Sequence, residues 1–539
     1  MAQVSRECPY LDTVNRKTLN FDFEKVCSVT LETHNVYACL VCGKYFQGRG
    51  HGTPAETHSV QANHYVFMNL SDGKVYCLPD NYEVKDTSLN DIRYNLYPQF
   101  TNEEIRDLDK VVLKKSDIFG TNYLRGITPM NEIGRADYIN AVMQLLSHVT
   151  PLRDFFLQED NYKNSRSDVV QAFGKLVCKI WSSRKIKASV SAHEFLQTVA
   201  WASKNQFDID CQADAADFLK WLMRELHIGL GGSHKSGSSI IHSCFQGEVL
   251  IETEILASAK DFSVMMEELS TFEKEKEKQE QGDTESNTQH RSATSSSSSS
   301  ANKSSTITSQ KVPALLLSLE LPASPLFKEG REGKSLIPEI DIREALQKFN
   351  GKKFFDSVVN GSIHRRRYRI TKLPPYIIMH MNRFIKTQFS VEKNSTIVDL
   401  CIHSLDMTPF KLSSVVDSKK EEVSRKRKRS KHGFPLTVPS LRPIASNKYN
   451  LVGNLCHHSA DPSAFAETSG PTTTSSNAKK AERESIPVIH NASYSAHVYS
   501  KPESQWYEVQ NLHVQATAPD IVGRSEAYLS LYENLSLSK

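Results

Sequence analysis

Two cysteines and two histidines near the start of the chain have the types and spacing of a metal site. Cys39 and Cys42 form a Cys-x-x-Cys turn, and His58 and His64 follow it. Such a turn places two thiolates on one side of an ion, and two imidazoles complete a tetrahedral set. The pattern predicts a structural zinc ion. Buried cysteines beside surface histidines are the less favoured alternative, because so small a domain usually needs a metal ion or a disulfide for stability.

Three further cysteines lie in the same region, namely Cys8, Cys27 and Cys77. Their spacing completes no second ligand set, and free cysteine is among the most buried residue types. We therefore expect small buried side chains, with a second metal site as the open alternative. Ten cysteines in the whole chain, five of them before residue 80, indicate metal binding in a reducing compartment rather than a disulfide scaffold.

The composition is that of an intracellular protein with more than one domain. A chain of 539 residues exceeds what one compact core usually holds. The formal net charge of +4 gives no overall field that would indicate a nucleic-acid partner. No apolar run approaches the roughly 20 residues that cross a bilayer, and the polar start predicts neither a secretory signal nor a membrane anchor.

The apolar pattern changes along the chain from helical to strand-like. A polar helix is expected from Glu103, and apolar residues at helical spacing then predict helices over 138–157, 169–181 and 215–230. Runs rich in valine, isoleucine, tyrosine and leucine predict strands over 245–255, 312–322, 368–384, 494–500 and 506–514. Helices first and strands later predict an α+β fold.

Three segments cannot bury enough apolar surface to offset the entropy of ordering them, and we predict disordered insertions at about 273–310, 405–445 and 459–484. The second contains the basic run RKRKRSK, which is either a nuclear localisation signal or a solvated charge run. A second basic cluster consists of Arg365, Arg366, Arg367 and Arg369. It either contacts phosphate or an acidic partner, or forms a solvated strand edge.

The metal cluster belongs to a longer pattern. The segments YACLVCGKYFQGRG and HSVQANHYVFMNLSDGKVYC resemble the UBP-type zinc finger of several deubiquitinases. The resemblance implies one zinc ion on Cys39, Cys42, His58 and His64. Tyr37 stands where the family often has tryptophan, which weakens the expectation that this finger captures a free ubiquitin C-terminus.

The remainder resembles the catalytic domain of ubiquitin-specific proteases, in the segments GITPMNEIGRADYINAVMQLL, QADAADFL, LPPYIIMHMNRF, NASYSAHV, WYEVQN and SEAYLSLY. This resemblance implies a papain-like α+β fold. We therefore expect a zinc finger over residues 6–103, a linker over 104–121 and a degenerate protease domain over 122–536, interrupted by the three insertions.

The positions that carry the family's chemistry are all changed. An isopeptidase of this class needs a thiolate nucleophile, a histidine base and a residue that orients the base. At the matching positions this chain has Asp137, Ser493 and Gln510, and Arg135 stands at the oxyanion-stabilising position. A carboxylate cannot form the thioester, and a serine hydroxyl does not titrate near neutral pH. The sequence therefore predicts a protein that is not an enzyme.

Other cysteines do not restore the lost nucleophile. Cys211 precedes the predicted helix at Gln212, and Cys456 precedes His457, but neither matches the nucleophile position. Cys178 lies in a helical apolar pattern and is expected in the core.

Several segments, among them CPYLDTVNRKTLNFDFEKVC, LQEDNYKN, TKLPPY and SEAY, resemble an inactive, splicing-associated branch of this family. That resemblance implies a nuclear, non-catalytic scaffold that assembles or stabilises the spliceosomal tri-snRNP and has tri-snRNP proteins as partners. The alternative is an adaptor that binds ubiquitin or a ubiquitin-like protein without cleaving it. An active deubiquitinase is the least favoured reading, and direct contact with RNA is open.

Overall fold

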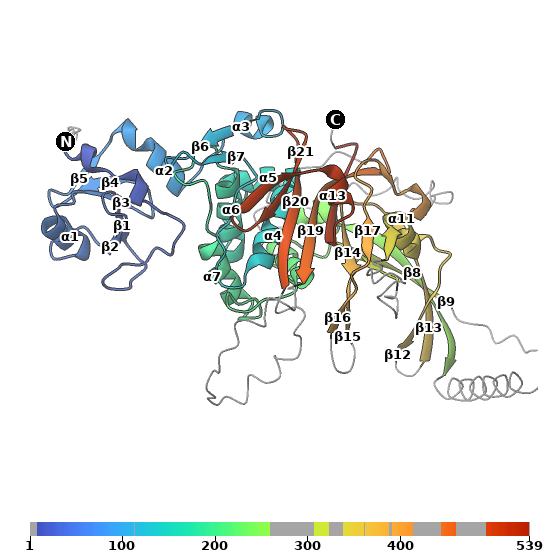
Figure 1. Cartoon of the computed structure of the whole chain (residues 1–539). Coiled ribbons are helices and arrows are strands. Elements are labelled where there is room, and N and C mark those ends of the chain that lie inside the picture. Colours follow the sequence, from blue (N-terminus) through green and yellow to red (C-terminus); the bar gives the residue numbers. More distant parts are fainter. Residues whose placement is uncertain are drawn as a thin grey trace, which may run out of the picture.

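A computed structural model of the chain describes residues 8–112, 114–258, 307–322, 338–359, 362–386, 391–412, 444–459 and 492–537. The N-terminal unit, a layer of helices and a group of β-sheets follow one another across the molecule (Figure 1). In the described part of the chain, no helix is long and apolar enough to cross a membrane.

The N-terminal unit is built on a five-stranded antiparallel sheet in the order β2-β1-β3-β4-β5. Its strands are β1 (Val36–Cys39), β2 (Tyr45–Gln47), β3 (Val66–Asn69), β4 (Val75–Cys77) and β5 (Tyr82–Val84). The helix α1 (Pro54–Ala62) connects β2 and β3, the 3₁₀ turns η1 (Leu11–Thr13) and η2 (Arg16–Thr18) precede the sheet, and η3 (Thr87–Leu89) and α2 (Asn90–Leu96) follow it. Short strands and two short helices form a small core, so we expect this unit to need a further constraint such as a metal ion.

The segment predicted as a linker contains regular structure. The helix α3 (Asn102–Asp107) begins with a capping box in which the Thr101 hydroxyl and the Glu104 carboxylate each accept a backbone N–H of the other residue. A two-stranded sheet of β6 (Lys114–Ser116) and β7 (Asn122–Leu124) follows.

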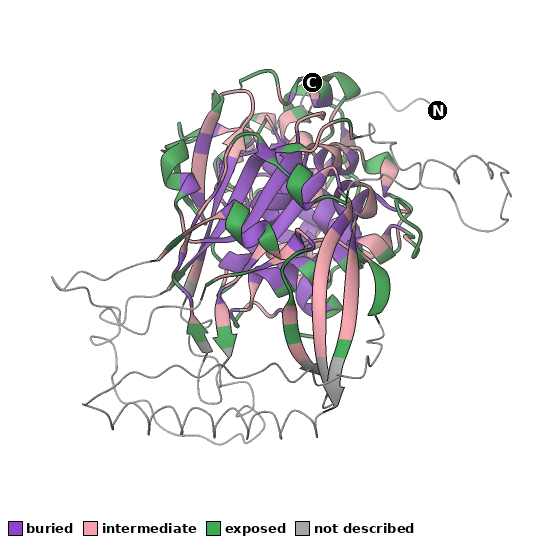
Figure 2. Ribbon diagram, turned by 90° about the vertical axis from the view of Figure 1, so that its right-hand side faces the viewer, coloured by how far each residue is buried: buried purple, intermediate pink, exposed green. Residues whose placement is uncertain are grey.

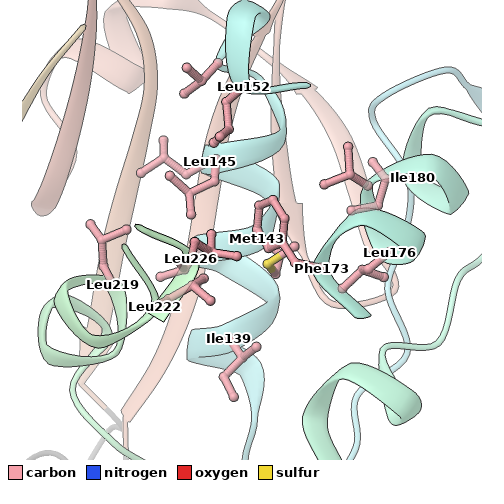
Figure 3. Packing of buried hydrophobic residues seen from close by; sticks show 14 of the residues in the cluster. Ile139, Met143, Leu145, Leu152, Phe173, Leu176, Ile180, Leu219, Leu222 and Leu226 are labelled. Atoms are coloured by element: carbon pink, nitrogen blue, oxygen red, sulfur yellow. The ribbon is translucent and has the colours of Figure 1, made fainter. Parts of the chain in front are cut away.

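A layer of helices surrounds α4 (Asp137–Ser147), all of whose residues are buried. The other members are α5 (Thr150–Leu157), α6 (Asp168–Trp181), α7 (His193–Ala202), α8 (Ala215–Gly229) and α9 (Ile240–Phe245), with the turn η4 (Glu159–Asn161). Met143 of α4 packs among Phe173 of α6 and Leu222 of α8 (Figure 3). The run predicted as one helix over 138–157 is two, separated by the extended Val149. Pro151 has no N–H for the Ser147 carbonyl and its ring would clash there, so a continuous helix cannot pass through it, whereas proline fits the first turn of α5.

The largest sheet has eight strands, ordered β10-β14-β23-β19-β20-β21-β22, with β18 paired to β19. These are β10 (Leu317–Glu320), β14 (Tyr376–Asn382), β18 (Leu405–Asp406), β19 (Lys448–Ser459), β20 (Ala492–Ser500), β21 (Gln505–Gln510), β22 (His513–Thr517) and β23 (Ala527–Asn534). The helix α4 contacts β19, β20 and β21. Helices and sheet therefore share one core, and the α+β expectation is confirmed.

A four-stranded antiparallel sheet, β12-β13-β8-β9, extends from the body (Figure 2). Its middle strands are largely half-buried, and β9 at one edge is mostly exposed. It consists of β8 (Gly247–Ser258), β9 (Ile307–Ala314), β12 (Phe355–Val359) and β13 (Ser362–Lys372). The remaining elements are β11 (Glu339–Asp341), α11 (Ile342–Ala345), η5 (Leu346–Phe349), β15 (Phe384–Lys386), β16 (Val391–Lys393), β17 (Ile397–Asp399), η6 (Thr408–Phe410) and α13 (Pro519–Gly523).

Two of the predicted insertions are shorter at one end than expected. Residues 307–310 belong to β9, and residues 405–410 form β18 and η6, where Leu405 and Phe410 join the core of the sheet. Leu405 and Phe410 pack against residues that are distant in the sequence, and the local composition does not reveal these contacts. The rest of both segments, the basic run 425–431 and the third predicted insertion beyond Ser459 lie outside the described residues.

The arginine cluster 365–369 lies on β13, and two of its four charges are paired within the sheet. Arg365 contacts Asp356 of β12 at 2.9 Å, and Arg367 pairs with Glu252 of β8. Cross-strand register brings these opposite charges together. Half of the cluster therefore forms cross-strand ion pairs.

The N-terminal unit docks on the helical layer through Asp22. One carboxylate oxygen lies 2.8 Å from Lys179 Nζ on α6, and the other accepts the Ser191 backbone N–H at 3.0 Å. Lys179 Nζ also donates to the Phe21 carbonyl. Both charged side chains are mostly buried, so this pair is shielded from solvent.

Replacing Asp22 with asparagine is expected to weaken docking of the finger by about 2 kcal/mol, the size of a charge-assisted hydrogen bond. Backbone hydrogen exchange over residues 19–25 should become faster in D22N. Glu24→Gln is the matched control, because Glu24 is exposed and makes one long contact with Gln197. Equal exchange in D22N and the unmodified protein would contradict this role.

Candidate metal centre and degenerate protease site

The four predicted ligands meet in one cluster. The Cys39 Sγ lies 3.6 Å from His64 Nδ1, the Cys42 Sγ lies 3.4 Å from His58 Nε2, and the two imidazole nitrogens are 3.1 Å apart. All four ligand atoms lie within 4.8 Å of one another. Ligands of a tetrahedral zinc ion are separated by about 3.3–3.8 Å, given metal–ligand bonds of roughly 2.0–2.3 Å. The geometry therefore fits zinc.

Local structure explains how these ligands converge. Cys39 ends β1, and a turn closed by the Gly43 N–H on the Cys39 carbonyl at 2.9 Å brings Cys42 back towards Cys39. Gly43 itself has a φ of +75°. A Cβ at this glycine would lie 2.2 Å from the Thr18 carbonyl oxygen, so a side chain does not fit. His58 lies on α1 and stacks on Phe46, with ring centroids 4.1 Å apart. His64 follows α1 directly, after a left-handed Asn63.

The remaining cysteines of the finger do not gather into a second centre. Among the described residues, the four-residue cluster is the only group of three or more potential ligands found close together. The Cys27 Sγ accepts backbone N–H groups of Val29, Thr30 and Gln47. Cys77 neighbours Cys8 and Tyr82, and burial raises the pKa of its thiol to about 11. These thiols are buried, as the sequence predicted.

Asp137, which the resemblance predicts at the position of the family's nucleophile, is buried and hydrogen-bonded through both carboxylate oxygens. It is the first residue of α4 and is 5% exposed. One carboxylate oxygen accepts the Tyr494 backbone N–H of β20 at 2.8 Å. The other accepts the Tyr138 N–H at 2.8 Å and the Gln212 side-chain amide at 3.0 Å. The carboxylate therefore joins the helical layer to the sheet.

The other predicted positions lie on the neighbouring strands. Gln510 at the end of β21 donates to the Ser493 hydroxyl of β20 at 3.3 Å, and Ser493 precedes the Tyr494 that binds Asp137. Arg135 is exposed, and its backbone N–H donates to the Ile209 carbonyl. The structure thus brings Asp137, Ser493 and Gln510 to one place. A carboxylate, a hydroxyl and an amide there offer neither a thiolate nor a base that titrates near neutral pH.

Cys456 has partners that its sequence neighbours did not predict. Its Sγ lies 3.5 Å from His497 Nδ1 on β20, and His497 Nε2 lies 4.0 Å from a Glu508 carboxylate oxygen on β21. Cys456 is 0% exposed, and burial raises the pKa of its thiol to about 12. A buried neutral thiol cannot reach a protein substrate, so this row of side chains is structural. Cys178 is likewise buried, whereas Cys211 is exposed.

Two histidines of β19 lie near the degenerate base position. His458 pairs in register with Ser493, its Nε2 lies 2.8 Å from the Ser495 hydroxyl, and burial lowers the pKa of its ring. His457 pairs with Tyr494 across the strands and packs edge-on against the rings of Tyr494 and Phe384. Both ring nitrogens are buried without a hydrogen-bond partner in the described structure. Burial lowers the pKa of His457 to about 3, so the ring is neutral and is no replacement for the missing base.

Burial raises the pKa of Asp137 from its ordinary value of 3.8 to about 6, and the hydrogen bonds from Tyr494 and Tyr138 only partly oppose this shift. The folded state therefore holds the proton more tightly than the unfolded chain does. The protonated Asp137 therefore adds about 3 kcal/mol to the free energy of unfolding. This contribution is complete below pH 3.8 and is lost as the pH rises through 6.

As the pH rises, the unmodified protein should lose stability relative to Asp137→Asn, whose side chain cannot titrate. We expect the difference in unfolding free energy to decrease by about 1.4 kcal/mol between pH 5 and pH 7.5. Urea unfolding of both proteins across this range tests it. Comparing the two at each pH cancels the shared pH dependence of the metal site. A constant difference would show that Asp137 has an ordinary pKa.

Comparisons with known proteins agree with this arrangement. The family "Ubiquitin carboxyl-terminal hydrolase" matches residues 129–532, and the "Zn-finger in ubiquitin-hydrolases and other protein" matches residues 27–89. The chain belongs to the ubiquitin carboxyl-terminal hydrolase family and carries its UBP-type zinc finger.

The curated relatives include ubiquitin carboxyl-terminal hydrolase 39 of Homo sapiens, which is 38% identical over 98% of this chain and 80% of the relative. The probable mRNA-splicing protein ubp10 of Schizosaccharomyces pombe is 34% identical over 98% of this chain and 88% of its own length. A solved structure described as an essential yeast splicing factor matches the fold with a TM-score of 0.64 at 22% identity, covering 97% of this chain and 99% of that one.

Proposed function

We propose that this protein is a non-catalytic scaffold of pre-mRNA splicing that assembles or stabilises the spliceosomal tri-snRNP in the nucleus. A relative named as a probable mRNA-splicing protein, similar over 98% of this chain, supports the process. The observation that best supports the absence of catalysis is the environment of Asp137. This residue matches the position of the family's cysteine nucleophile, and its carboxylate is buried and accepts the Tyr494 backbone N–H.

In this proposal both domains act as binding surfaces. Zinc held by Cys39, Cys42, His58 and His64 stabilises the finger and supplies no chemistry, because a closed four-ligand site has no open position. Proteins rather than RNA are the favoured partners, since Arg365 and Arg367 of the basic cluster already pair with carboxylates.

The test is affinity purification of the tagged, full-length protein from nuclear extract, before and after ribonuclease treatment. Enrichment of tri-snRNP proteins that survives the treatment would support a protein-contacting scaffold. Recovery of ubiquitin conjugates in their place would contradict it and favour an adaptor for ubiquitin or a ubiquitin-like protein. Cleavage of a ubiquitin C-terminal amide substrate by the purified protein would overturn the non-catalytic assignment.

A further inference from the structure

A pocket of about 620 Å³ lies at the seam between the finger and the helical layer. Its walls come from the finger residues Phe21 and Lys25, the segment 96–102, the end of α5 with η4, and the facing sides of α6 and α7. Pockets of this size at domain interfaces are typical places for ligands. The degenerate protease site contributes none of its lining residues.

Lys25 is the charged side chain that distinguishes this pocket. Its ammonium donates to the Leu70 carbonyl at 3.2 Å and to the Tyr97 hydroxyl at 3.1 Å. Both acceptors are neutral, and no carboxylate of the described residues lies within ion-pair distance of Lys25 Nζ. A partly buried cation whose charge is not balanced favours an anion that enters the same space.

Most of the other charged side chains around the pocket have an oppositely charged partner. Lys175 pairs with Glu194 at 2.7 Å, and Lys179 pairs with Asp22 at 2.8 Å. Of the two acidic residues of η4 that also line the pocket, Asp160 pairs with Lys163, and Glu159 is exposed to solvent. Burial, together with Lys175 and Lys179, lowers the pKa of Lys25 to about 8, whereas Glu194 raises it. Lys25 is thus the cation of the inner wall without a counter-charge of its own.

We propose that this seam pocket binds an anionic oxygen group, a carboxylate or a phosphoryl, carried on a ring-sized apolar body. Lys25 receives the anion. The rings of Tyr97, Phe100 and Tyr162, which line the same pocket, supply apolar surface for the body. A ligand placed here contacts the finger and α6 together, so it stabilises the docked arrangement of the two domains.

Chemical labelling of the unmodified, full-length protein tests this proposal. Limiting N-hydroxysuccinimidyl acetate at pH 8, followed by mass spectrometry, reports the reactivity of each lysine. An amine with a pKa near 8 is about half neutral at this pH, so Lys25 should react at least tenfold faster than the exposed Lys115. Phenylacetate and phenyl phosphate at tens of millimolar are the anionic probes, and phenylacetamide is the neutral control.

We expect at least one anion to slow acetylation of Lys25 threefold or more, without affecting Lys115. The more protective anion identifies whether the group is a carboxylate or a phosphoryl. No protection of Lys25 by either anion, or equal protection by phenylacetamide, would overturn the proposal. As a second measurement, line broadening of the protecting anion in NMR should be lost in Lys25→Met and kept in Lys115→Met.

Discussion

Replacing Cys39 with alanine is expected to remove the zinc ion and unfold the finger while the protease-like domain stays folded. The free energy of binding a structural zinc ion is roughly 10–16 kcal/mol, and in small units this is most of the folding free energy. The finger has a five-stranded sheet of short strands and no described disulfide, so no other interaction of that size replaces the metal. Native mass spectrometry should find one zinc ion in the unmodified protein and none in the variant.

The control for this experiment is Cys8→Ala. Cys8 is buried in the same unit but lies outside the ligand cluster, so this variant should keep its zinc. The protease-like domain has a separate core around α4, and its near-ultraviolet circular dichroism should persist in C39A. Full zinc occupancy in C39A would show that the four-residue assignment is incorrect.

Asp137→Cys, which restores the family's nucleophile, is expected to destabilise the protein and to produce no hydrolase. A thiol is a weak acceptor and cannot serve the Tyr494 N–H and the Gln212 amide together. Each buried donor left without a partner costs about 1–3 kcal/mol, and we expect a total near 3 kcal/mol. The new thiol would have no base, since Ser493 and Gln510 occupy the supporting positions.

Asp168→Cys is the matched control, because Asp168 is also the first residue of a helix but is exposed. That variant should change the unfolding free energy by less than about 0.5 kcal/mol, as is usual for surface positions. Urea unfolding compares the two variants, and release of a fluorophore from the ubiquitin C-terminus measures hydrolysis. If D137C were as stable as D168C, the carboxylate would not be the link between α4 and β20 that its contacts describe.

Local pattern predicted the longer helices α4, α6 and α8 and several strands but missed other elements, among them β19 and α7. The strand β19 lies between β20 and β23, yet Asn450, Gly453 and Asn454 disrupt its strand-like pattern. The helix α7 was also missed, although its apolar residues Phe195, Leu196 and Val199 have helical spacing. Neighbouring strands and helices stabilise both elements, and such support is not encoded in a short window of sequence.

The sequence by itself determined which side chains are available for chemistry. A Cys-x-x-Cys turn with two later histidines predicts a metal site, and Asp137 and Ser493 at the positions that match the family's cysteine and histidine predict the loss of a thiol protease. Side-chain chemistry is a property of the residue type. Predicting the metal site and the loss of protease chemistry therefore required only the residue types at the positions that match the family's motifs.

Only the tertiary structure decided what the replaced residues do instead. Asp137 became a buried link because Tyr494, far away in the sequence, presents its backbone N–H there. In the same way, strand register neutralises Arg367 with Glu252, and domain docking places Lys25 in a pocket with Tyr162. Burial, charge pairing and pKa depend on partners brought together by folding, and no local pattern contains them.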